Sequence, residues 1–244
     1  MPHPDGTPWR ALRSLVTDLP EPGAAARAHS ERVTAHIRVA MAATAGYLPF
    51  SRYMELALYA PGLGYYAAGA AKLGAAGDFV TAPEMTPLYG AALATQVAAI
   101  LAATQRREIV ELGGGSGRLA ADLLAALAAL AALPSRYTIL EPSPDLARRQ
   151  RETLSRDAPA HLERVAWVDV LPESIDGALI ANEVLDAVPA TIVARRGEAW
   201  LERGVVWDDA RSAFAWAERP AGARVAEVAA TRFPGGGEIG RAHV

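Results

Sequence analysis

The feature that most constrains the fold is an alternation of short apolar segments with longer helical ones, which begins at Arg107. The apolar segments have the length of buried strands, and the segments between them have the period and composition of helices. Such an alternation predicts an α/β fold with a parallel sheet. The expected strands are Glu108–Leu112, Tyr137–Glu141, Val165–Val168 and Ala178–Ala181, and the expected helices are Arg118–Leu133 and Pro144–Ser155, the latter capped by Ser143.

A glycine-rich loop joins the first expected strand to its helix. The strand ends at Glu111-Leu112, and Gly113, Gly115 and Gly117 follow at alternate positions. The dinucleotide fingerprint requires a glycine where Arg118 stands, and the phosphate-binding P-loop requires a Lys-Ser/Thr pair that is absent. The remaining pattern is the acidic-x-Gly-x-Gly-x-Gly loop that methyltransferases place under the methionine portion of S-adenosylmethionine. The alternative is a packing turn between strand and helix.

Acidic residues follow the next two expected strands. Glu141 ends the second strand, where a carboxylate can accept two hydrogen bonds from a ribose diol. Asp169 follows the third strand, where methyltransferases commonly have an acidic residue near the adenine amino group. The alternative for each is a solvated strand end. The order of the three features predicts a site for S-adenosyl-L-methionine.

The region before Arg107 is expected to form a helical lobe with a long glycine-rich loop. Helices are expected at Ala24–Ala45, closed by Gly46, at Pro49–Tyr59, and at Pro87–Ala103. Between the last two, Leu63–Thr86 is rich in glycine and lacks periodicity. Because long loops in compact domains are more often functional than idle, this loop is a candidate part of the site.

Four sequence blocks resemble the MidA family of class I methyltransferases, whose mitochondrial members act in the assembly of respiratory complex I. The blocks occur in the family's order: Phe50–Tyr66, Gly77–Glu84, Glu111–Gly117 and Ala181–Pro189. The chain departs from the family at Val184 and Leu185, where aromatic residues are usual, and at Gly114, where proline is frequent. The resemblance implies a Rossmann-like sheet with an N-terminal helical and glycine-rich lobe and a β-hairpin insertion.

The resemblance also implies methyl transfer to an arginine of a protein substrate, a complex I subunit or its bacterial counterpart. A guanidinium is protonated at neutral pH, so carboxylates that hold it can orient one nitrogen and localise charge on the others. Alternatives for the acidic residues are helix capping by Asn182, a helix-dipole role for Glu183, and solvated loop carboxylates. The predicted catalytic residues are Asn182, Glu183, Asp186 and Glu84, and the predicted cofactor-binding residues are Glu111, Gly113, Gly115, Gly117, Glu141, Asp169, Val170, Asp78 and Thr81.

The C-terminal part is expected to contain a short helix at Glu183–Val188 and then β-structure. A strand at Thr191–Arg195 and a hairpin of Trp200–Val206 with Ala213–Ala217 form the predicted insertion, about residues 190–218. The predicted organisation is a lobe at 1–104 and an S-adenosylmethionine-binding domain at 105–237. Residues 238–244 read as a non-native tail, and family members continue further, so we expect a truncated chain of low stability.

Composition excludes several other functions. The chain lacks cysteine, so disulfides and thiolate metal sites are excluded, and the histidines are too scattered to predict a metal site. A net charge of −3 gives no reason to expect nucleic acid, and no stretch is apolar enough to span a membrane. A cytoplasmic protein is the default, and the oligomeric state is not specified. We interpret Arg148–Arg151 as the solvated face of a helix and Tyr65-Tyr66 as lobe core.

Two other functions are compatible with the same cofactor half. One is a methyltransferase that acts on a small molecule or nucleic acid, although the Asn-Pro-Pro-aromatic signature of amino-base methylation is absent and Asn182–Leu185 stands at that location. The other is a non-catalytic assembly factor that binds a partner protein and retains the cofactor pocket. Cofactor binding without methyl transfer would favour the assembly factor.

Overall fold

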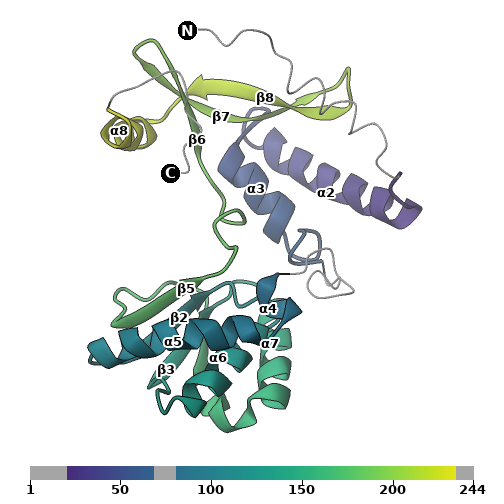
Figure 1. Ribbon diagram of the computed structural model, residues 1–244. Coiled ribbons are helices and arrows are strands. Elements are labelled where there is room, and N and C mark those ends of the chain that lie inside the picture. The colour runs from purple at the N-terminus through teal and green to yellow at the C-terminus, as the bar shows by residue number, and fades with distance from the viewer. Residues whose placement is uncertain (1–20, 69–80, 235–244) are drawn as a thin grey trace, which may run out of the picture.

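The computed structural model describes residues 21–68 and 81–234, which contain two sheets (Figure 1). One is parallel, with the strand order β4-β3-β2-β5. The other is antiparallel, and its strands come from both ends of the chain. The α/β class and the parallel sheet that the sequence predicts are confirmed.

The parallel sheet is built from the four strands predicted, with ends shifted by at most one residue. They are β2 (Glu108–Leu112), β3 (Arg136–Leu140), β4 (Val165–Val168) and β5 (Gly177–Ala181), and the helices of this part are α4 (Ala82–Met85), α5 (Leu88–Ala103), α6 (Arg118–Ala129), α7 (Pro144–Asp157) and η2 (Pro159–Arg164). Ser143 caps α7 as predicted, since its hydroxyl accepts from Leu146 N at 3.4 Å.

The three long helices α5, α6 and α7 cover one face of the parallel sheet. Ile109, Tyr137 and Ala178 occupy paired positions in β2, β3 and β5, so their side chains share a face, and all pack in one apolar core with residues of the three helices. Leu179 points to the opposite face, where its side chain is 54% exposed. Among the described residues, β5 is an edge strand. The low stability expected of this chain stays a prediction.

The antiparallel sheet has the order β1-β7-β6, and β8 pairs with the other part of β7. Its strands are β1 (Tyr47–Pro49), β6 (Ile192–Arg196), β7 (Ala199–Asp208) and β8 (Ala213–Pro220). The predicted hairpin is present, and β1 of the N-terminal lobe pairs with it. Helices α2 (Ala24–Ala42) and α3 (Phe50–Tyr59) pack with this sheet around a second apolar core, and α8 (Ala223–Arg232) packs against β7.

One of the two connections between the sheets leads from β5 to β6 and begins at the carboxyl end of β5 (Figure 1). In an open parallel sheet, ligands bind outside the carboxyl ends of the strands, so this connection begins where a site is expected. Within the described residues, no helix has the length and apolarity to span a bilayer.

Candidate functional site

The glycine loop between β2 and α6 has the backbone that its sequence predicts. Gly113, Gly115 and Gly117 all have positive φ, at 63°, 53° and 85°. Residues other than glycine rarely adopt these φ angles. Gly117 N closes the turn by donating to Gly114 O at 2.8 Å. Cβ atoms at Gly113 and Gly117 would meet Val184 and Gln150 of the protein, so we expect a ligand to lie against the backbone at Gly115.

Glu141 follows β3 and lies beside this loop. Its Oε1 accepts from Ser143 N at 3.0 Å, and its Oε2 accepts from Gln150 Nε2 at 2.8 Å. Burial raises the pKa of the Glu141 carboxyl, while the hydrogen bonds from Ser143 and Gln150 lower it. The side chain is 8% exposed, and each oxygen has a further lone pair. This carboxylate is therefore held in place and can accept hydrogen bonds from a diol.

Glu111 is more deeply placed than its neighbours in the site. Its side chain is 2% exposed, and its Oε2 accepts from the Tyr137 hydroxyl at 2.8 Å, inside the helix-covered face of the sheet. Burial raises the pKa of Glu111 to about 7, and the negative charge of Glu141 acts in the same direction. Glu111 thus supports the sheet beneath the loop, and a direct contact with the cofactor stays a prediction.

The segment after β5 is a turn, and the helix predicted at Glu183–Val188 is wrong. Glu183 has φ 51°, which breaks the helical path, and Ala187 N donates to Val184 O at 3.0 Å. Leu185 and Val188 are exposed, so no packed face compensates the cost of starting so short a helix. Because there is no helix at this position, the alternative roles of Asn182 as a helix cap and of Glu183 at a helix dipole are excluded. A left-handed non-glycine residue is a local strain that functional sites often contain.

This turn, Asn182–Val188, lies directly against the glycine loop. A Cβ atom added to Gly113 would be 3.2 Å from Val184 Cγ2. The Tyr89 hydroxyl of α5 donates to Asn182 Oδ1 at 2.7 Å, which holds the start of the turn. Both carboxylates of the turn, Glu183 and Asp186, are on exposed residues. Two residues predicted to be catalytic thus belong to a turn that contacts the predicted cofactor loop through Val184.

An aromatic cluster from the N-terminal lobe covers the other end of the turn. The Tyr59 hydroxyl donates to Ala187 O at 2.9 Å, and the Tyr59 ring stacks on Tyr66 with centroids 5.6 Å apart. Burial raises the pKa of Tyr59 to about 12, with further contributions from Tyr66, Glu141 and Asp186. Tyr65 packs edge-on against Tyr66, and both are half-buried, so the interpretation of this pair as lobe core stays a prediction.

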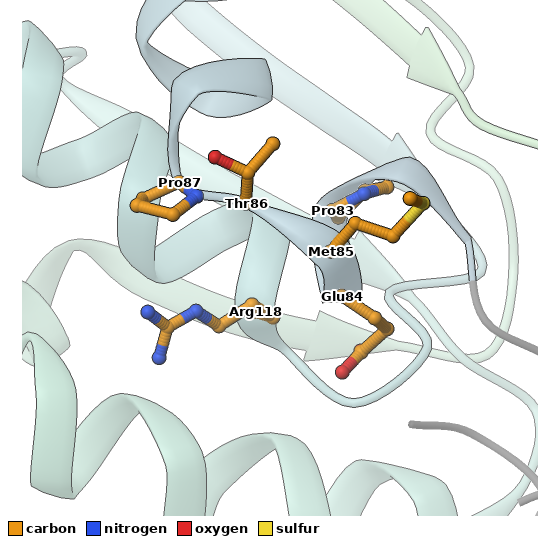
Figure 2. Close-up of a pocket in the computed structure, with 6 residues that line it drawn as sticks. All are labelled: Pro83, Glu84, Met85, Thr86, Pro87 and Arg118. Atoms are coloured by element: carbon orange, nitrogen blue, oxygen red, sulfur yellow. The ribbon is translucent and has the colours of Figure 1, made fainter. Parts of the chain in front are cut away.

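Glu84 reaches the glycine loop from the short helix α4. Its Oε1 accepts a hydrogen bond from the Ser116 hydroxyl. Glu84 lines a shallow pocket together with Arg118, whose guanidinium points away from it, toward Asp122 and Asp157 (Figure 2). Thr81 precedes α4, and its carbonyl accepts from Glu84 N at 2.9 Å. Asp78, the other predicted residue of this loop, lies outside the described residues.

Asp169 and Val170 are exposed at the carboxyl end of β4. The structure thus places Glu84, Glu141, the turn and the glycine loop around the carboxyl ends of β2, β3 and β5, with Asp169 and Val170 at the neighbouring strand. Ser116, Tyr59 and Gln150 also belong to this arrangement and were not predicted from the sequence. Ser116 lies within the glycine motif, so that motif alone could have indicated it.

The donor set suits an organic cofactor better than a metal ion. In the described part of the chain, no group of three or more His, Asp or Glu side chains is placed to hold a metal. The loop offers close backbone approach, and Glu141 offers a charged acceptor one strand away. These features fit the methionine portion and the ribose of S-adenosyl-L-methionine. We assign those two contacts to the glycine loop and to Glu141 as predictions.

The fold and the site define a class I methyltransferase, and the comparisons agree. Residues 92–237 match the family model of S-adenosyl-L-methionine-dependent methyltransferases. The chain belongs to this family, as a MidA-like member, and S-adenosyl-L-methionine is its cofactor. A protein of Burkholderia thailandensis with bound S-adenosyl-homocysteine is 48% identical, with a TM-score of 0.76 over 89% of this chain and 56% of that one.

Curated relatives include mitochondrial proteins named protein arginine methyltransferase NDUFAF7. The homologue of Caenorhabditis elegans is 31% identical over 64% of this chain and 42% of its own length. The protein of Rattus norvegicus is 32% identical over 72% of this chain and 46% of its own length. The chain thus spans less than half the length of these relatives.

We expect Glu141→Ala to weaken S-adenosyl-homocysteine binding by about 10- to 100-fold while the fold persists. The reason is the loss of a charged acceptor for two hydroxyls. Titration calorimetry measures the affinity, and circular dichroism checks the fold. Glu152→Ala, an exposed glutamate of the adjacent helix α7, is the matched control. A dissociation constant of Glu141→Ala equal to that of the control would remove Glu141 from the cofactor site.

Proposed function

We propose that the chain is the cofactor-binding and catalytic part of a protein arginine methyltransferase. The observation that carries the proposal is the position of the Asn182–Val188 turn. Its Val184 side chain lies against Gly113 of the glycine loop, the exposed residues Glu183 and Asp186 stand on the same turn, and Glu84 contacts the same loop at Ser116. The names of relatives at 27–32% identity support arginine as the acceptor. A complex I subunit, or its bacterial counterpart, is the proposed acceptor protein.

The acceptor group explains why carboxylates are needed here. A guanidinium is a planar cation whose N–H donors have a fixed, fork-like geometry. The two oxygens of a carboxylate bind it through two parallel hydrogen bonds. Glu183 and Asp186 stand on one turn whose ends are held by hydrogen bonds from Tyr89 and Tyr59. The guanidinium would therefore bind to carboxylates on a backbone that is held in place. The stacked rings of Tyr59 and Tyr66 add aromatic faces that attract a cation.

S-adenosyl-L-methionine supplies an electrophilic methyl group on a sulfonium. A new N–C bond forms as the S–C bond breaks, S-adenosyl-homocysteine leaves, and the guanidinium nitrogen gives up a proton. The carboxylates align that nitrogen, stabilise the remaining charge, and take the proton or pass it to solvent. Asp186 is our candidate for the main contact, because its negative charge raises the pKa of both Tyr59 and Tyr66, the two stacked rings of the aromatic cluster.

We expect Asp186→Asn to lower methyl transfer by about 10- to 100-fold with little change in cofactor affinity, because one charged partner of the guanidinium is lost. The assay follows the transfer of labelled methyl to an arginine-bearing acceptor protein, and calorimetry follows S-adenosyl-homocysteine. Glu198→Gln, in the exposed β6–β7 turn, is the control.

Three outcomes would contradict the proposal. Label on a residue other than arginine would give another acceptor. Label on a small molecule would favour the other methyltransferase class. Cofactor binding with no transfer to any candidate subunit, by this chain extended to the length of its relatives, would favour the non-catalytic assembly factor.

A further inference from the structure

Gln150 is buried in the part of α7 that the sequence presents as a solvated arginine-rich face. Its exposure is 0%, so the interpretation of Arg148–Arg151 as a solvated face is wrong for this residue. The arginines around it do turn outward: Arg148 and Arg149 pair with Asp145, and Arg151 lies over the Trp167 ring. An uncharged polar side chain that is completely buried needs partners, since an unsatisfied buried polar group destabilises the folded state.

The Gln150 amide joins three separate elements. Its Nε2 donates to Gly115 O in the glycine loop at 3.1 Å and to Glu141 Oε2 at 2.8 Å. Its Oε1 accepts from Trp167 Nε1 of β4 at 2.9 Å. Indole nitrogen is only a donor, while the carbonyl and the carboxylate are acceptors, so this arrangement permits a single amide orientation. Both N–H groups of the amide are therefore used, one on each part of the cofactor site.

The packing of the glycine loop is centred on the same residue. A Cβ atom at Gly114 would be 3.2 Å from the Gln150 amide, and one at Gly117 would be 3.0 Å from Gln150 Cα. The loop is thus pressed onto the helix α7 at this point, and its carbonyl at Gly115 is fixed by the amide. One side chain thus contacts both the loop and the Glu141 carboxylate.

We propose that Gln150 is a positioning residue for the cofactor: it holds the glycine loop and the Glu141 carboxylate in one fixed relation, so that the methionine portion and the ribose are bound together. This inference rests on the assignment of these two contacts to the cofactor. It does not depend on which acceptor is methylated. Gln150 itself acts through its neighbours, since every hydrogen atom of its amide nitrogen is used within the protein.

The first test replaces the amide by an apolar side chain of similar length. We expect Gln150→Met to weaken S-adenosyl-homocysteine binding by about 10- to 100-fold, measured by calorimetry on the folded protein. Leu154→Ala is the matched control, because Leu154 is equally buried in α7 and its apolar side chain makes no hydrogen bond to the site. We expect this control to lower the melting temperature while the folded protein keeps its affinity. A Gln150→Met protein that binds like the native chain, or no worse than Leu154→Ala, overturns the proposal.

The second test asks whether Gln150 acts through Glu141. In a double-mutant cycle, Gln150→Met should cost much less affinity when Glu141 is already alanine, because the carboxylate that it orients is gone. Strictly additive losses would mean that the link to Glu141 contributes nothing. If Gln150→Met does not fold, Trp167→Phe removes only the donor that orients the amide, and a loss of about 3- to 10-fold is expected.

The same titrations separate this inference from the proposed function. A native chain that does not bind S-adenosyl-homocysteine overturns the cofactor site and Gln150 with it. Normal binding by the native chain and by Gln150→Met overturns the positioning role alone. A failure of arginine methylation leaves the binding data, and therefore this inference, unchanged.

Discussion

Gly115→Val should abolish cofactor binding, with an expected loss of affinity of about 1,000-fold or more. Gly115 has φ 53°, where a β-branched residue is a conformational outlier, so the loop must change its path to accept valine. A changed path moves the Gly115 carbonyl from Gln150 and places a side chain where the backbone meets the ligand. Calorimetry with S-adenosylmethionine and with S-adenosyl-homocysteine measures the loss.

Gly197→Val is a matched control for backbone strain. Gly197 has φ 59°, nearly the same angle, but lies in the β6–β7 turn with open space around the Cβ position. Both variants therefore carry the same conformational cost, and only Gly115→Val touches the loop. We expect the control to lose some stability and keep its affinity. Unchanged affinity in Gly115→Val would show that the assigned pocket is wrong.

The parallel sheet could be predicted because each strand carries a local signal. Segments such as Val165–Val168 are short and apolar, and the helices between them have a clear period. The glycine loop also carries a local signal, since glycine permits positive φ, and all three alternate glycines after the strand have it. The cap at Ser143 is a further local rule that the structure confirms.

Contacts between distant parts of the chain could not be predicted in this way. The pairing of β1 with β7 joins Leu48 to Val205, and no periodicity near Tyr47–Pro49 indicates a partner. This strand pairing requires glycine at position 204, because a Cβ atom there would be 2.1 Å from the Leu48 carbonyl oxygen. Gln150 was missed for the same reason, since all of its partners lie outside its own helix.

The turn after β5 shows how a local rule can fail inside a site. The sequence Glu183–Val188 followed by Pro189 has helical propensity and a stop signal, which together favour a short helix. Its exposed apolar residues give no packing energy, and Tyr89 and Tyr59 instead hold the turn by its polar groups. Tertiary hydrogen bonds thus decide the conformation of the residues that we propose for catalysis.

Glu111→Gln should change how stability depends on pH, because burial raises the pKa of Glu111 to about 7. In the unfolded chain this carboxyl loses its proton near its ordinary pKa of about 4.3. Between these two values the folded state binds more protons, so the free energy of unfolding of the native chain falls as pH rises. From 1.36 kcal/mol per pKa unit, the loss is about 4 kcal/mol, and it is complete above pH 7.

The amide of Glu111→Gln has nearly the same shape and stays neutral, and its oxygen can still accept from Tyr137. The variant should therefore match the native chain near pH 4, become the more stable of the two by about 4 kcal/mol at pH 8, and give a flatter profile. Urea unfolding at a series of pH values measures this difference, with Glu163→Gln, an exposed glutamate, as the control. Parallel profiles for the native chain and Glu111→Gln would mean that Glu111 titrates like a solvated carboxyl, and the buried pair with Tyr137 would then not form in solution.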